Sequence, residues 1–150
     1  MYKIGKKEIN RIERLFKSGK IFRYGMGGEC DQFERRWANQ VGVSYCRMSR
    51  SGTSALYTAL VGMNVGPGDQ VIVPAYTYMA TALSVLAVGA IPVVADIDTS
   101  LTLCPKDFEK RITKYTRAVI PVHMAGLPCD MKRIKKIADK HNILILEDVC

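Results

Sequence analysis

The feature of this sequence that most constrains its fold is a regular alternation of short apolar runs with stretches of helical spacing. The apolar runs fall at residues 43–48, 70–74, 91–97, 118–124 and 143–148. Strands separated by helices of about ten residues need right-handed crossovers, which produce a mostly parallel sheet. Most of the runs are almost continuously apolar, as strands are when helices cover both faces of a sheet. The sequence therefore predicts an α/β fold with three layers.

The helices expected between these runs cover residues 53–63 and 77–88, a segment that begins at Pro105, and residues 130–141. Two further helices are predicted before the first run, because apolar residues recur at helical spacing from Ile9 to Phe16 and again from Phe33 to Val41. The basic N-terminal segment precedes the alternation. We therefore expect residues 1–28 to form an arm with a helix outside the sheet, and the sheet domain to begin at residue 29.

The positive charge of the chain does not indicate nucleic-acid binding. The sequence has 22 Lys and Arg residues against 14 Asp and Glu residues, a net charge of +8, but residues 51–104 contain no Lys or Arg. Many of the basic residues fall on the polar faces of predicted helices, and no aromatic side chains are interleaved with them to stack on bases. Solvated helix faces explain this pattern, so no nucleic-acid partner is expected.

Neither a membrane segment nor a metal site is expected. The longest apolar stretch, residues 82–95, is too short to cross a bilayer, and the N-terminus lacks the apolar core of a secretory signal. The five cysteines are Cys30, Cys46, Cys104, Cys129 and Cys150. They form no C-x-x-C pair and only two histidines accompany them, so no zinc site is predicted. These features predict a cytoplasmic protein with reduced thiols.

The first candidate site lies where the run at 43–48 turns into the next helix. This turn reads Ser51-Gly52-Thr53-Ser54. Gly52 lets the backbone approach an anion closely, and the hydroxyls of Thr53 and Ser54 stand at a helix N-terminus that has free N–H groups. The spacing fits neither a P-loop nor a dinucleotide fingerprint. The alternative is an ordinary N-cap, which uses the same residue types.

Two further candidates also follow strand ends. Tyr76 and Tyr78 come after the run at 70–74, where a ring could offer its face to a planar ligand or pack against neighbouring helices. Glu147 and Asp148 end the last run, and only one of them can face a given cleft because side chains alternate along a strand. A buried aspartate there needs a cationic partner. The alternative is a solvated strand end or a helix N-cap.

Together, these three candidates meet the requirements of pyridoxal phosphate. Its phosphate needs N–H donors, its ring needs a flat partner, and its pyridine nitrogen needs a carboxylate that keeps it protonated as an electron sink. In open α/β folds ligands bind at the carboxyl ends of the strands, where all three candidates are predicted to lie.

Five segments, at residues 51–56, 66–78, 95–98, 121–126 and 147–148, stand in the order and spacing of one known family. They resemble the DegT/StrS-type aminotransferases, and the resemblance runs from about residue 4 to residue 150. It implies a fold type I large domain and pyridoxal phosphate as the cofactor. It also implies amino transfer from glutamate or glutamine to a keto-sugar or related cyclitol, in a homodimeric enzyme.

Carried over residue by residue, the resemblance assigns Gly52, Thr53 and Ser54 to the cofactor phosphate. It assigns Tyr78 to the face of the pyridine ring, where Phe and Trp are also usual, and Asp148 to the ring nitrogen.

Two other residues are predicted to lie near the same crevice. His123 lies at a strand end and is a candidate to contact cofactor or substrate, the alternative being a structural imidazole. Cys129 precedes a predicted helix and is expected to be a buried spacer rather than a nucleophile.

The family's Schiff-base lysine follows a Ser-Phe segment beyond the Glu-Asp strand, and this chain contains no such segment. Its twelve lysines fall on predicted helix faces or in the N-terminal arm. A solvated lysine is not positioned to act as an imine-forming nucleophile. We therefore expect residues 29–150 to be the N-terminal part of the cofactor-binding large domain, cut short at Cys150, and the chain alone to be inactive.

Three alternatives stay open from the sequence. One is a cofactor-free interaction module of the same fold, and another is a nucleotide-binding α/β domain that uses the same turn. The third is a sugar dehydratase of the same family, in which histidine replaces the lysine. In the fold that the resemblance implies, the strands after residues 147–148 lie between the last run and the run at 43–48. That run is expected to lack a neighbour on one side, while the other four strands pair in one sheet.

Overall fold

The computed structural model describes residues 3–22 and 27–150. The chain divides into two compact units, Met1–Met48 and Ser49–Cys150, which are described separately. The sequence predicted a boundary at residue 28, whereas the helix that follows this residue groups by its contacts with the preceding segment. The domain assignment itself stays a prediction.

The first unit contains helices α1 (Lys6–Ser18) and α2 (Glu29–Val41), as predicted. Both end at a glycine in the left-handed conformation, Gly19 at φ 66° and Gly42 at φ 78°. This conformation suits glycine because it has no Cβ atom to clash with the backbone.

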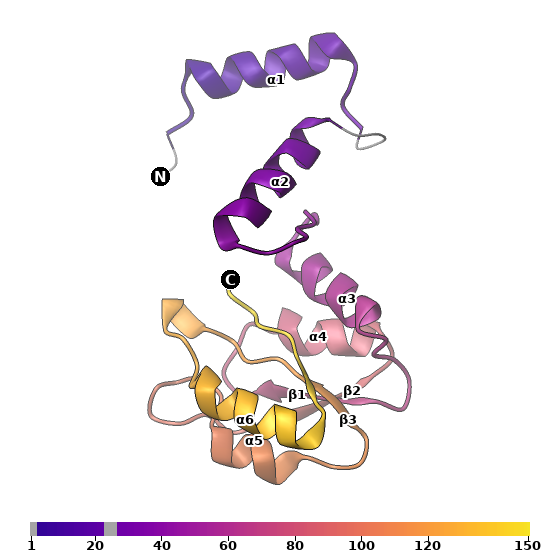
Figure 1. The fold of residues 1–150 in the computed structure, drawn as a ribbon, viewed down its shortest axis with the longest axis vertical. Helices are drawn as coiled ribbons and strands as arrows, with labels where there is room; N and C mark the ends of the chain where they lie inside the picture. The colour runs from indigo at the N-terminus through magenta and orange to yellow at the C-terminus, as the bar shows by residue number, and fades with distance from the viewer. Residues whose placement is uncertain (1–2, 23–26) are drawn as a thin grey trace. The chain divides into compact units, whose positions relative to one another are not determined.

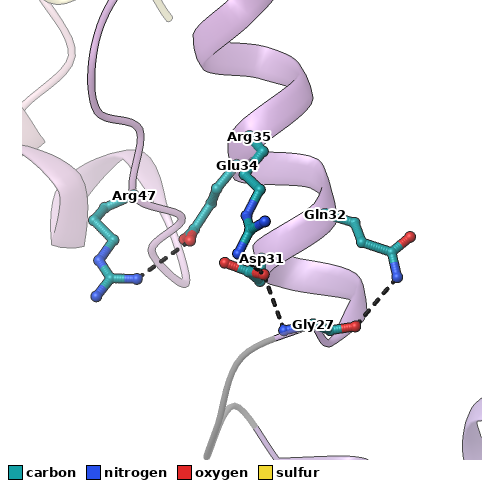
Figure 2. Close-up of polar contacts among 6 residues, drawn as sticks. All are labelled: Gly27, Asp31, Gln32, Glu34, Arg35 and Arg47. Atoms are coloured by element: carbon teal, nitrogen blue, oxygen red, sulfur yellow. Dashed lines mark hydrogen bonds and ion pairs between the residues drawn. The ribbon is translucent and has the colours of Figure 1, made fainter.

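The buried carboxylate of Glu34 on α2 organises the end of this unit (Figure 2). It accepts a hydrogen bond from the Met48 backbone N–H at 2.7 Å and from the Arg47 guanidinium at 3.3 Å. The strand predicted at 43–48 is therefore wrong, because these residues form no strand in the structure. A strand exists only with a paired neighbour, whereas the N–H of Met48 is bonded to a side chain instead.

The second unit contains a four-stranded parallel sheet, which confirms the predicted α/β class. The strands are β1 (Gln70–Pro74), β2 (Ile91–Ala95), β3 (Thr116–Val119) and β4 (Leu144–Ile145). Their order across the sheet is β2-β1-β3-β4, and every pairing is parallel. The four later runs thus pair in one sheet, as predicted.

Helices cover both faces of this sheet (Figure 1). They are α3 (Gly52–Gly62), α4 (Ala80–Ala87), α5 (Pro105–Arg111) and α6 (Met131–His141). Val71 and Val73 of β1 share one buried cluster with residues of α3 and α4. Ile72, which points the other way, lies in a second cluster with residues of α5 and α6. The alternation along β1 thus separates the two helical layers.

Several predicted elements are shorter in the structure, including the run at 91–97, of which only Ile91–Ala95 forms a strand. The runs at 118–124 and 143–148 pair as regular strands only over β3 and β4, followed by one isolated bridge between Val122 and Asp148. Helix α4 begins at Ala80 rather than at residue 77. Tyr76 and Tyr78 therefore lie in the loop that follows β1. Among the described residues, no helix is long and apolar enough to cross a membrane.

Leu60 and Leu83 test this core with one chemical change. Leu60 of α3 is fully buried against the sheet, whereas Leu83 of α4 is half exposed. Leu60→Ala should lower the free energy of unfolding by about 2–5 kcal/mol, because it leaves a cavity. Leu83→Ala should cost less than about 1 kcal/mol, since little buried surface is lost. Urea denaturation followed by circular dichroism measures both values, and equal losses would contradict this core.

Candidate functional site

The candidate site is built around Asp148, at the carboxyl edge of the sheet. Its Oδ2 accepts a hydrogen bond from the Thr81 hydroxyl at 3.1 Å, and its Oδ1 accepts one from the Cys150 backbone N–H at 3.3 Å. Its own backbone N–H donates to the Pro121 carbonyl at 3.0 Å, so β3's continuation fixes its position. This half-buried carboxyl group receives two hydrogen bonds, and its oxygens can accept a further one from the N–H of a ligand.

Helix α3 begins with the turn that the sequence singled out. The Ser51 side chain caps the helix, accepting from the Ser54 backbone N–H at 3.1 Å, and the Ser51 and Ser54 hydroxyls lie 3.0 Å apart. Ser51 is therefore an ordinary N-cap residue, as the alternative interpretation of this turn predicted. The first-turn N–H groups of Gly52 and Thr53 receive no acceptor from the described residues, as expected at a helix N-terminus. Free N–H groups at this end of a helix attract an anion.

The turn and the Asp148 segment lie next to each other. A Cβ atom added at Gly52 would stand 3.3 Å from the Sγ of Cys150, which is two residues beyond Asp148. This spacing is tighter than an ordinary van der Waals contact. Glycine at this position therefore keeps open the space between the helix N-terminus and the chain that carries Asp148.

The loop between β1 and α4, together with the first turn of α4, supplies hydroxyl groups and an aromatic ring to the same region. The buried Thr81 hydroxyl lies 2.8 Å from the Thr77 hydroxyl, so Thr77 can donate to Thr81 while Thr81 donates to Asp148. Tyr78, three residues before Thr81, is 80% exposed, and Tyr76 is 48% exposed. Tyr78 thus presents an exposed ring three residues before the threonine that contacts Asp148. Sequence reasoning missed Thr81, although its position in the first turn after Tyr78 was a usable signal.

Glu147 points towards His123 whereas Asp148 points towards Thr81, as the alternation along a strand predicts. Its Oε2 lies 2.9 Å from His123 Nε2. The Nδ1 of His123 accepts a hydrogen bond from the Cys129 backbone N–H at 3.0 Å. Both ring nitrogens are therefore used within the protein. This arrangement favours the structural alternative for His123, and its contact with a substrate stays a prediction.

Cys129 has the properties of a buried spacer. Its side chain is buried, and its thiol donates to the Val122 carbonyl at 3.2 Å. Burial raises the pKa of the Cys129 thiol. Since the thiolate is the nucleophile, this environment disfavours reactivity.

Within the described residues, no lysine side chain completes the site around Asp148. All twelve lysines are exposed, and none of them contacts Asp148. Over residues 3–22 and 27–150, no group of three or more His, Cys, Asp or Glu side chains could hold a metal ion. The groups available in this region are instead the N–H and hydroxyl groups at the start of α3, the exposed ring of Tyr78 and the Asp148 carboxylate. This set suits a phosphorylated heteroaromatic ring that carries a protonated nitrogen.

Comparisons with known proteins identify a family and relatives with similar sequences. The model of the DegT/DnrJ/EryC1/StrS aminotransferase family matches residues 2–150. The spore coat polysaccharide biosynthesis protein SpsC of Bacillus subtilis (strain 168) is 39% identical over 146 residues, which are 97% of this chain and 37% of that protein. The dTDP-3-amino-3,4,6-trideoxy-alpha-D-glucose transaminase of Streptomyces venezuelae is 44% identical over 138 residues, or 91% of this chain and 36% of that protein.

A solved structure shares the fold over the whole chain. It is the E. coli GDP-4-keto-6-deoxy-D-mannose-3-dehydratase with bound hydrated PLP, with a TM-score of 0.87 and 27% identity. The similarity covers 100% of this chain and 40% of that one. The present chain thus spans well under half the length of these three relatives.

The two cysteines of this region should differ in reactivity. We expect N-ethylmaleimide at pH 7.5 to modify Cys150, which is exposed, at least about tenfold faster than Cys129, whose raised pKa leaves less thiolate. Peptide mass mapping of a time course measures both rates, and the chain unfolded in urea serves as the control in which both sites react. Equal rates in the folded chain would contradict the burial of Cys129.

Proposed function

The chain belongs to the DegT/DnrJ/EryC1/StrS aminotransferase family, and on this premise we propose that it forms the phosphate- and pyridine-binding part of an aminotransferase. The proposed enzyme depends on pyridoxal phosphate and transfers an amino group from glutamate or glutamine to a keto-sugar or related cyclic ketone. Members of this family use pyridoxal phosphate, and the named PLP in the dehydratase structure agrees with this cofactor.

The observation that carries the proposal is the placement of Asp148 beside the N-terminus of α3. The Thr81 hydroxyl and the Cys150 N–H hold the Asp148 carboxylate in place without neutralising it. A carboxylate held in this way is suited to keep a pyridine nitrogen protonated. When bound, pyridoxal phosphate supplies an electron sink that depends on this protonation.

The remaining donors fit the other parts of the cofactor. Gly52 and Thr53 supply free N–H groups for a phosphate, and the hydroxyls of Thr53 and Ser54 stand in the same turn. The absence of a Cβ at Gly52 keeps that space open against Cys150. The exposed ring of Tyr78 is suited to cover one face of the pyridine ring.

The substrate class rests on the relatives. The Streptomyces venezuelae protein is named as a transaminase of a dTDP-linked amino sugar, and the Bacillus subtilis protein is named for polysaccharide biosynthesis. A keto-sugar acceptor for the present enzyme agrees with both names. The identity of the amino donor, glutamate or glutamine, is part of the proposal.

We further propose that the Schiff-base lysine lies outside these 150 residues. The exposure of all twelve lysines supports this, because an imine-forming lysine must be desolvated and placed beside the cofactor. The second candidate function is sugar dehydration. It is favoured by the similarity to the dehydratase over the whole chain, and product analysis with a keto-sugar and an amino donor distinguishes the two reactions.

Asp148→Asn tests the central assignment in the enzyme that contains these residues. We expect kcat for amino transfer to fall more than about 100-fold, or about 2.7 kcal/mol in transition-state stabilisation, because a neutral amide cannot keep the ring nitrogen protonated. Glu147→Gln is the matched control and should cost less than about tenfold, since Glu147 faces His123. Turnover of Asp148→Asn within a few-fold of wild type would remove Asp148 from this role. Equal damage from both variants would show that the wrong carboxylate was chosen.

The 150-residue chain alone should neither transaminate nor be labelled at one lysine. After incubation with pyridoxal phosphate and reduction with borohydride, peptide mass mapping should show scattered, substoichiometric labels on exposed lysines. The reason is that no lysine amine among the described residues is desolvated beside Asp148. Stoichiometric labelling of a single lysine together with amino transfer to a keto-sugar would overturn the proposal that the lysine lies elsewhere.

A further inference from the structure

We propose that His123 is a positioning residue, held as the Nε2–H tautomer, which anchors Glu147 and thereby sets the direction of the Asp148 carboxylate. The inference deepens the proposed function and rests on it only where Asp148 is taken to meet the cofactor. The hydrogen bonds that carry it are all within the second unit and need no ligand.

The neighbours of the ring select one tautomer. A backbone N–H can only donate, so the Cys129 N–H at 3.0 Å requires a lone pair on His123 Nδ1. The ring proton must then sit on Nε2, which lies 2.9 Å from Glu147 Oε2. A carboxylate only accepts, so the two contacts agree on the same tautomer.

The backbone and the side chain of His123 both form hydrogen bonds with the segment that contains Glu147 and Asp148. Its N–H donates to the Asp148 carbonyl at 3.0 Å, and the Asp148 N–H donates in turn to the Pro121 carbonyl at 3.0 Å. His123 therefore bonds both to the side chain of Glu147 and to the backbone of Asp148. The segment cannot rotate about its axis without breaking several of these bonds at once.

Fixing Glu147 determines where Asp148 points. Neighbouring side chains on an extended segment face opposite ways, so a Glu147 turned towards His123 leaves Asp148 turned towards Thr81. The His123 side chain is only 10% exposed and has no ring nitrogen left for a ligand. It therefore acts through Glu147 and Asp148 rather than by touching a substrate.

The loop that supplies the Cys129 N–H is itself anchored. The Cys129 thiol donates to the Val122 carbonyl at 3.2 Å, one residue before His123. The loop thus returns to its own starting strand, and both bonds keep the Cys129 N–H aimed at the imidazole.

Nitrogen NMR of the chain tests the tautomer directly. In the 150-residue chain labelled with ¹⁵N-histidine at pH 7.5, His123 should show an unprotonated signal for Nδ1 and a protonated signal for Nε2. His141 is the only other histidine, and His141→Gln assigns the signals. A proton on Nδ1 would overturn the proposal. Signals averaged between the two tautomers would also overturn the proposal. Such averaging would mean that the hydrogen bonds from Cys129 and to Glu147 do not hold the ring in one state.

Variants of His123 in the active enzyme test the positioning role. His123→Phe keeps a ring but removes both hydrogen bonds, and we expect kcat to fall about 10- to 100-fold. The absorption spectrum of the bound cofactor should shift in the same direction as in Asp148→Asn. His123→Gln, which can still donate to Glu147, should recover part of the lost rate. A role in packing alone would leave the spectrum unchanged and would give no recovery in His123→Gln, and either result would overturn the proposal.

Glu147→Ala tests whether His123 acts through Glu147. If His123 acts through Glu147, the double variant with His123→Phe should be no slower than the slower single variant by more than about twofold. If the losses in kcat of the two single variants instead multiply in the double variant, His123 does not act through Glu147 and the proposal is overturned.

The positioning role of His123 and the cofactor role of Asp148 can be rejected independently of each other. An unaffected Asp148→Asn enzyme with the expected histidine tautomer rejects the cofactor assignment alone, whereas an inactive Asp148→Asn enzyme with a fully active His123→Phe variant rejects the role of His123 alone.

Discussion

The parallel pairing of the last segment of the chain with the end of β3 is the interaction on which the rest of the site depends. Regular pairing ends at Ile145, but backbone hydrogen bonds continue from Leu146 to Val119 and from Asp148 to Pro121. They carry two carboxylates to the edge where α3 and α4 begin. Because parallel strands all end at the same edge, a single register places the acid, the anion-attracting helix terminus and the aromatic loop together.

The distribution of charged residues along the chain determines which groups of this site can hold an anion. Residues 51–104 supply the helix terminus and the aromatic loop, yet they contain no lysine or arginine. Any anion held at the start of α3 by this part of the chain is therefore held by N–H dipoles and hydroxyl groups. Such donors are fixed by the fold itself, so the geometry of the turn matters more here than the number of positive charges.

The sequence predicted the elements whose signals are local. β1 follows a clear turn and was predicted to the residue, and Asp130 at the start of α6 acts as the N-cap that its residue type favours. The strand predicted at residues 43–48 is wrong because an apolar run does not reveal whether a partner strand exists. The bonding partners of Thr81 and His123 could not be predicted, although a structural imidazole was one of the two alternatives stated for His123. The Thr81 hydroxyl meets a carboxylate 67 positions away, and the His123 ring is oriented by a backbone N–H in a loop.

The contact between Gly52 and Cys150 ties together two positions at opposite ends of the second unit. The missing Cβ of one and the thiol of the other occupy what is in effect a single small volume. A larger residue at 52 can be accommodated only if residue 150 becomes smaller or moves, and the reverse holds as well. These two positions should therefore be redesigned as a pair, because a change at either one alters the space available at the other.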